Sequence, residues 1–171
     1  MKRTALVCTL AACAGFFALA STPYAQEPVS TPQDFIAQAA SAGELKFQAA
    51  KLALSKSRAD DVQAFAQQVI DDHTKAGSDL KSLAREKNLL AAEESAVPDS
   101  GSQLAAESEG SFNAAYASEQ VAIGERVVTL FTEAADHSPD ADVQDYARNN
   151  LPVLKRHLEM ARELEKAHAM D

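Results

Sequence analysis

An alternation of four and three residues between inward positions runs through the segment from residue 60 to about 87. The positions in this row, here called a seam, are Val62, Ala66, Val69, His73, Ala76, Leu80 and Leu83. Such spacing keeps one side of an α-helix against a core along its whole length. The segment is therefore predicted to be one long helix. Its seam includes a histidine, His73, at a position where an apolar side chain would pack better.

Three further segments show the same helical periodicity. The first opens with a cap at Thr31 and runs to about Leu54, the third starts near Ser111, and the fourth opens with a cap at Ser138 followed by Pro139. Their inward positions are Phe35, Ala39, Ala42, Leu45, Ala49 and Leu52, then Phe112, Tyr116, Ile123, Val127, Leu130 and Ala134, then Val143, Ala147, Asn150, Leu154, His157, Ala161 and Leu164. The fourth seam contains a second histidine, His157.

Composition supports a bundle of helices. The 171 residues are 46% hydrophobic, but only 6% are aromatic and tryptophan is absent. A core of this kind is filled by alanine, leucine and valine, which suits helices that approach one another closely. A chain of this length is expected to form one domain, here residues 31–171, of the all-α class.

The lengths of the connections predict a topology. Short turns join the first helix to the second and the third to the fourth, so each pair should be antiparallel. The connection from Asn88 to Gly110 is long enough to cross the whole bundle, with a short helix near Gln103 to Ser108. The second and third helices can then run parallel, as in a ferritin-like four-helix bundle with a long crossover. A simple up-down order stays open.

The N-terminus resembles an export signal. Lys2 and Arg3 precede an apolar stretch from Ala5 to Ala20, which is shorter than the roughly 18 residues of a membrane span. We expect a signal peptide within residues 1–25, cleaved after Ala20 or Ala25, and a tether at 26–30. These features predict a periplasmic or outer-membrane-associated protein without a transmembrane span after cleavage.

Both cysteines, Cys8 and Cys13, lie within the predicted signal peptide. Ordinary cleavage would remove them, which excludes disulfides and thiol catalysis in the mature chain. The alternative is lipidation, because residues 10–13, Leu-Ala-Ala-Cys, have the form of a lipoprotein cleavage box. In that case Cys13 would anchor the protein to a membrane.

The charge of the chain excludes one class of partner. The formal net charge is −9, and removal of Lys2 and Arg3 takes it to about −11, since no acidic residue precedes Glu27. Such a surface repels nucleic acid and anionic lipid, and suits cations or basic partners. Known catalytic and nucleotide-binding motifs are missing as well. An enzymatic role is therefore not favoured.

The two seam histidines are the candidate functional residues. His73, His157 and Glu44, with Asp72 and Glu119 as further ligands, could bind Fe, Mn, Zn or Cu in the bundle core. The Glu-x-x-His pattern of a di-iron site is absent, because Ile70 and Leu154 stand three residues before the histidines. The alternative is a pair of buried histidines held by hydrogen bonds. Rings within about 5 Å of each other, with converging carboxylates, would favour the metal.

Three segments resemble the exported family known as domain of unknown function 4142, whose members are often labelled predicted outer membrane proteins. They are FIAQAASAGELKFQAAKLALSKS in the first helix, DVQAFAQQVIDDHTKAGSDLKSLA in the second and LPVLKRHLEMA in the fourth. The resemblance covers roughly residues 34–167. It implies a ferritin-like four-helix fold, and it implies no activity, because the molecular role of the family is undefined.

The resemblance also bears on the candidate site. It equates Glu44, the pair Asp72 and His73, and His157 with residues of the family pattern. The third helix departs from that pattern, because an Asp-His pair before the V-x-L-F run is replaced by Ile123 and Gly124. A metal site shared with the family would be incomplete here unless Glu119, Glu125 or water supplied the missing ligand.

Two functions are consistent with these observations. The favoured one is a non-enzymatic binding or structural protein of the envelope, whose partner is an unidentified envelope protein. The alternative is a metal-binding or metal-dependent oxidase-type protein that uses Glu44, His73 and His157. A homo-oligomer stays open in both cases.

Overall fold

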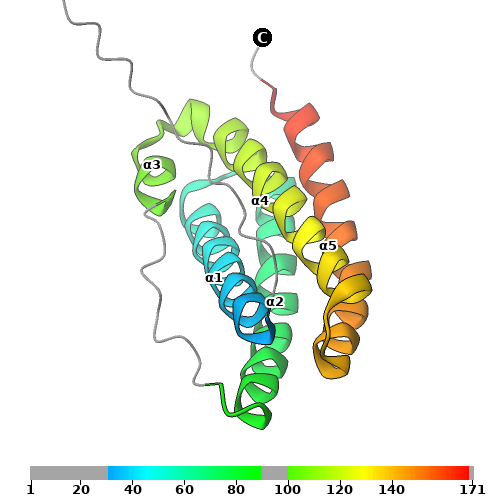
Figure 1. The fold of residues 1–171 in the computed structure, drawn as a ribbon. Helices are drawn as coiled ribbons and strands as arrows, with labels where there is room; N and C mark the ends of the chain where they lie inside the picture. Colours follow the sequence, from blue (N-terminus) through cyan, green and yellow to red (C-terminus); the bar gives the residue numbers. More distant parts are fainter. Residues whose placement is uncertain (1–30, 90–99, 170–171) are drawn as a thin grey trace, which may run out of the picture.

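The computed structural model describes residues 31–89 and 100–169, and these form a bundle of helices (Figure 1). The helices are α1 (Pro32–Lys56), α2 (Asp60–Glu86), α3 (Ser100–Ala106), α4 (Glu109–His137) and α5 (Ala141–Ala167). The described residues contain no strand, so the predicted all-α class is confirmed. The predicted signal peptide, the tether at 26–30 and the lipidation site at Cys13 lie outside the described residues.

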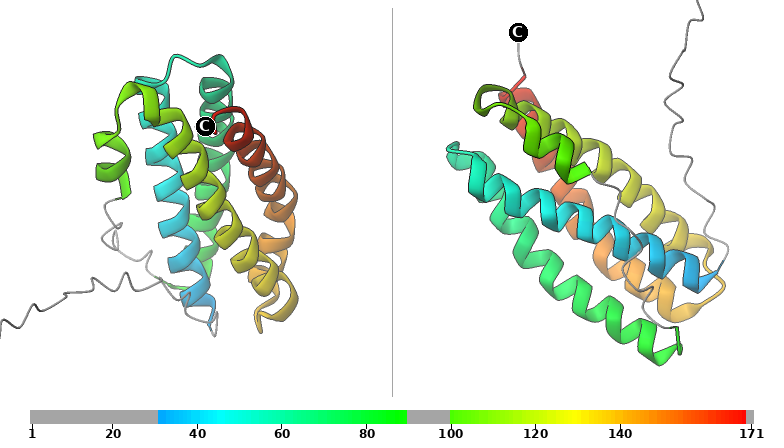
Figure 2. Two further views of the ribbon diagram at one scale, coloured as in Figure 1. Left: turned by 90° about the horizontal axis from the view of Figure 1, so that it is seen from above. Right: turned by 90° about the vertical axis from the view of Figure 1, so that its left-hand side faces the viewer.

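The four long helices pack as two pairs. Helix α1 lies against α2, and α4 against α5; α1 also contacts α4, and α2 contacts α5. Figures 1 and 2 show α2 and α4 running in the same direction, while the partners within each pair run in opposite directions. The parallel order of the second and third long helices is therefore the one found. Short helix α3 lies against α1 and α4.

The helix ends follow their capping chemistry. Thr31 Oγ1 accepts a hydrogen bond from the backbone N–H of Asp34, as predicted, at 3.1 Å. The predicted cap of the last helix at Ser138 is wrong. Asp140 caps α5 by accepting from the N–H groups of Asp142 and Val143, because its carboxylate reaches two unpaired donors at once. Ser138 instead ends α4.

The core is divided along the bundle into two apolar clusters. One contains Phe35, Ile36, Ala39, Leu80, Leu83, Ala84, Ile123, Val127, Leu130, Phe131, Ala134, Ala135, Val143, Ala147 and Leu154. The other contains Ala49, Ala50, Ala53, Val62, Phe65, Ala66, Val69, Leu104, Phe112, Tyr116, Ala117, Ala161 and Leu164. Each long helix contributes to both clusters. On each helix a short interval separates the two contributions, and those intervals position the candidate site.

Gly124 lies where α4 and α5 approach closely. A Cβ atom at this position would lie 3.1 Å from Leu158 Cδ1 and 3.7 Å from Leu158 Cα. Leu158 of α5 therefore packs directly over the glycine. This is the place where the family pattern has a histidine, according to the resemblance, so in this chain a leucine side chain occupies the space beside α4.

A larger residue at position 124 should separate α4 from α5. Gly124→Leu is expected to lower the unfolding free energy by about 1–3 kcal/mol, because its side chain would collide with Leu158. Gly77→Ala is the matched control, since nothing lies within 4 Å of its added Cβ. The control should gain up to ~1 kcal/mol of helix propensity. Urea denaturation measures both, and equal stability of Gly124→Leu and wild type would contradict this packing.

Candidate functional site

Four polar side chains, one from each long helix, lie between the two apolar clusters. They are Lys46 of α1, His73 of α2, Gln120 of α4 and His157 of α5. Lys46 and His157 are each 1% exposed, and Gln120 is fully buried. Buried lysine is rare in proteins unless a carboxylate accompanies it. These four residues are called the polar layer below.

Asp72 orients His157. Its Oδ2 atom lies 2.9 Å from His157 Nε2, and it also accepts hydrogen bonds from Arg156 and Gln68. Burial raises the pKa of Asp72, but the hydrogen bonds from Gln68 and His157 and the nearby charges outweigh it, and the net pKa is lowered. An ionised carboxylate only accepts hydrogen bonds, so His157 Nε2 carries a proton. In the neutral ring, Nδ1 then has a free lone pair.

His73 lies in the same layer as His157. The centres of the two rings are 6.0 Å apart. Burial, the Lys46 ammonium and His157 together lower the pKa of His73 to about 3, against a smaller opposing effect of Asp72. Burial and Lys46 also lower the pKa of His157. Both rings are therefore neutral near pH 7.

Lys46 is the residue that the sequence analysis missed. Burial lowers its pKa to about 8, and within the two described ranges it forms no ion pair. A periodic signal was present, because Lys46 stands seven residues after Ala39 and seven before Ala53. Gln120 was missed in the same way, four residues after Tyr116. Because lysine and glutamine are polar, both residues would be expected to lie at the surface. Their spacing from the buried residues of the same helix indicates instead that their side chains face the core.

Several buried polar atoms around the layer have no hydrogen-bond partner among the described residues. They are His73 Nε2, His157 Nδ1, both side-chain polar atoms of Gln120, and the Tyr116 hydroxyl. Buried polar atoms in folded proteins nearly always have a partner in the protein or in ordered solvent. The protein atoms alone therefore do not satisfy this layer.

The predicted site residues divide into two groups. Asp72, His73 and His157 come together, as described above. Glu44 is exposed, and its carboxylate accepts a hydrogen bond from Gln48 at 2.5 Å. Glu119 is half-buried on α4 near Tyr116, whose pKa is raised by burial and then by this carboxylate.

The arrangement does not suit a metal cation. The described residues contain no group of three or more His, Cys, Asp or Glu side chains that could hold a metal ion. The ring centres are 6.0 Å apart, outside the criterion of about 5 Å given in the sequence analysis, and the adjacent Asp72 carboxylate is occupied by His157 and Arg156. Lys46 also brings a positive charge to the layer, and this charge would repel a metal ion.

A cleft of about 580 Å³ opens between α1 and α2 and reaches the polar layer at His73. Its walls include small residues of both helices, among them Gly43 and Gly77. Its floor is formed by Val127, Phe131, Tyr146, Asn150 and Leu154 of α4 and α5. The exposed residues Glu44 and Lys81 contribute to its lining as well. Most of the lining is apolar.

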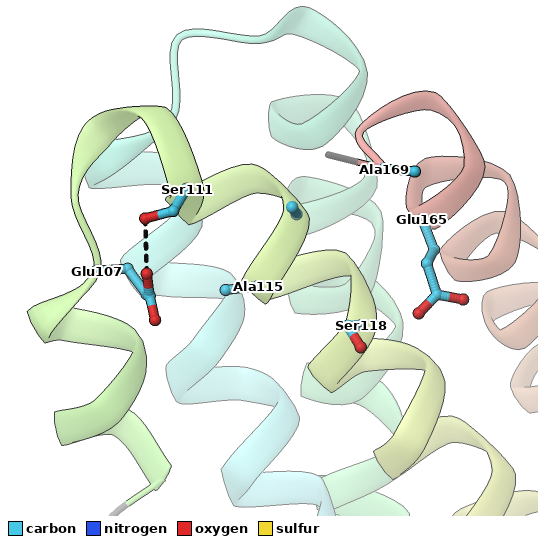
Figure 3. A pocket seen from close by; sticks show the side chains of 7 residues that line it. Glu107, Ser111, Ala115, Ser118, Glu165 and Ala169 are labelled. Atoms are coloured by element: carbon cyan, nitrogen blue, oxygen red, sulfur yellow. Dashed lines mark hydrogen bonds between the residues drawn. The ribbon is translucent and has the colours of Figure 1, made fainter. Parts of the chain in front are cut away.

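A second depression lies beside α4 (Figure 3) and has a volume of about 330 Å³. It is open to solvent and is lined by alanines, serines, Glu107 and Glu165. The Ser111 hydroxyl already donates to Glu107 at 2.6 Å. Figure 3 shows Glu107 and Glu165 on either side of the labelled α4 residues. Nothing in this depression points to a ligand.

Replacing Lys46 by methionine should stabilise the protein near neutral pH. The unfolded lysine has a pKa of 10.5 and the folded one about 8. Between these values the unfolded chain binds a proton that the folded chain does not, so wild-type stability rises with pH across this window. The stability lost below pH 8 is about 3 kcal/mol. Lys46→Met removes this loss.

Urea denaturation of both proteins at pH 7, 8, 9 and 10, in buffer without halide, measures the effect. The difference between them cancels titrations that they share, including those of His73, His157, Asp72 and Tyr116. The stability advantage of Lys46→Met should be largest at pH 7 and shrink toward pH 10. An advantage that is absent, or constant with pH, would show that the Lys46 pKa is normal.

Comparison with known proteins places the chain in a family. Residues 18–164 match the family described as Domain of unknown function (DUF4142). No curated protein and no solved structure matches the chain. The family match spans most of the sequence and includes every residue of the polar layer. The chain therefore belongs to the DUF4142 family.

Proposed function

We propose that this protein is a non-enzymatic binding protein of the bacterial envelope, and that it holds a small, mainly apolar ligand in the cleft between α1 and α2. The observation that carries this proposal is the cleft itself. Its volume of about 580 Å³ falls within the roughly 300–1,000 Å³ typical of small-molecule sites. Such sites are mostly apolar and contain a few polar groups, as this cleft does.

The lining favours an elongated ligand with one hydrogen-bonding end. Ile36, Leu80 and Phe131 offer apolar surface, while His73 supplies a neutral imidazole where the cleft meets the polar layer. The Tyr146 hydroxyl is already used, because it donates to the Ala76 carbonyl at 3.0 Å. It ties α5 to α2 beside the cleft and so helps to keep the cleft in shape.

The cleft is poorly equipped for acid-base catalysis. A general base works best when its pKa is near the working pH, whereas the pKa of His73 is lowered to about 3. Thr74, another lining residue, donates its hydroxyl to the Ile70 carbonyl. Binding without turnover is the function that these groups support.

The wider setting is also part of the proposal. The parallel order of α2 and α4 supports a ferritin-like bundle. The pattern of residues 1–25 supports export to the periplasm or the outer membrane, with lipidation at Cys13 as the alternative form of attachment. Among the described helices, none is both long enough and apolar enough to cross a bilayer. The metal-binding alternative with Glu44, His73 and His157 is not favoured, because Lys46 lies beside both imidazoles.

Filling the cleft should abolish ligand binding. Gly77→Leu places a side chain in open space within the cleft, and it should weaken binding of a neutral dye such as Nile red by at least about tenfold. Gly110→Leu is the matched control, since nothing lies within 4 Å of an added Cβ there either and Gly110 is not part of the cleft lining. Fluorescence titration measures both variants. Equal binding by wild type and Gly77→Leu, or no binding by wild type, would contradict the proposal.

A further inference from the structure

The polar layer, together with the adjoining Tyr116 of the second apolar cluster, is rich in hydrogen-bond donors. Lys46 offers an ammonium, Gln120 an amide N–H₂ and Tyr116 a hydroxyl, and the last two have no partner among the described residues. The unpartnered acceptors around them are His157 Nδ1, Gln120 Oε1 and, in one tautomer, His73 Nε2. The excess of donors over acceptors and the positive charge of Lys46 both favour a negatively charged occupant.

Among the described residues no carboxylate forms an ion pair with Lys46, and the half-buried Glu119 acts on the Tyr116 hydroxyl but does not contribute to the shift of the Lys46 pKa. Asp72 is committed to His157, Arg156 and Gln68 through one oxygen, Oδ2, and it does not contribute to the shift of the Lys46 pKa. A charged group buried without a counter-charge is strongly unfavourable. Either the amine gives up its proton or a small anion enters with it.

Aromatic packing keeps the donors together. Phe65 contacts the Tyr116 ring edge-on, with centres 6.2 Å apart, and the His157 ring in the same way at 6.3 Å. Gln120 follows Tyr116 by one helical turn on α4. Phe65 therefore links the unpartnered groups of α4 to the imidazole of α5.

We propose that the polar layer binds one small monovalent anion, of halide or formate size, between Lys46, Gln120 and Tyr116. The anion is the counter-charge of Lys46 and accepts hydrogen bonds from the amide and the hydroxyl. It enters from the cleft past His73 and Gly43, which both line the cleft and lie close together, because a Cβ at Gly43 would be 3.7 Å from His73 Nδ1. The layer thus selects an anion where metal-binding bundles hold a cation.

This inference is independent of the ligand proposed for the cleft. Loss of the anion site would leave Nile red binding unchanged, whereas the cleft variant Gly77→Leu keeps all three anion-binding side chains. The failure of one proposal is therefore distinguishable from the failure of the other.

Thermal denaturation at pH 7 tests the anion site. Sodium gluconate is replaced stepwise by sodium bromide at constant ionic strength, so that a small anion replaces one too large for the layer, and the variants below control for the other differences between the two salts. The melting temperature of wild type should rise by about 3–8 °C and then level off, as expected for one saturable site. Lys46→Met and Gln120→Leu should lose most of this rise.

Lys81→Met is the matched control, because it removes the same charge from an exposed position that lines the cleft. It should respond to bromide as wild type does. Anomalous diffraction from bromide-soaked crystals should show one strong peak between Lys46, Gln120 and Tyr116. An equal rise in wild type and Lys46→Met, or bromide found only at surface positions, would overturn the proposal.

Discussion

The buried ammonium of Lys46, which forms no ion pair with any residue that the structure describes, is the constraint on which the rest of this structure depends. It lies where the two apolar clusters of the core meet, 1% exposed. Burial lowers the pKa values of both seam histidines, and the charge of Lys46 lowers them further. A buried cation of this kind destabilises a fold unless something compensates it. The bundle retains it nonetheless. Positions that lower stability without an evident structural benefit are typical of functional sites.

The acid nearest to the two histidines, Asp72, is paired with residues other than Lys46. Asp72 holds the proton of His157 on Nε2 and is itself paired with Arg156 at 2.9 Å, so its negative charge is taken up at the edge of the layer rather than at Lys46. The donors that remain are those of Lys46, Gln120 and Tyr116, and they have no acceptor in the described protein. His73 belongs to the layer and also lines the cleft. The bundle therefore presents an apolar site and a donor-rich polar site next to each other.

Much of the fold could be predicted from the sequence, because helical seams and caps are local signals. The seam of α2 and the Thr31 cap were found in this way, and so were the inward residues of α4. The centre of the site was harder to predict. Glu44 was expected in the core, but it stands two residues before Lys46, which is about 200° around a helix, and it faces solvent. The position of His73 along the bundle axis, relative to that of His157, depends on how α2 packs against α5. No local sequence pattern encodes that packing.

The protonation of Lys46 is the central claim, and nuclear magnetic resonance measures it directly. In protein labelled with ¹³C at lysine Cε, one resonance should titrate near pH 8 in buffer without halide, and Lys46→Met should lack that resonance. Addition of bromide should move its midpoint upward, since an anion stabilises the ammonium. If every lysine titrated above pH 10, with or without bromide, Lys46 would be solvated or paired and the account would be wrong.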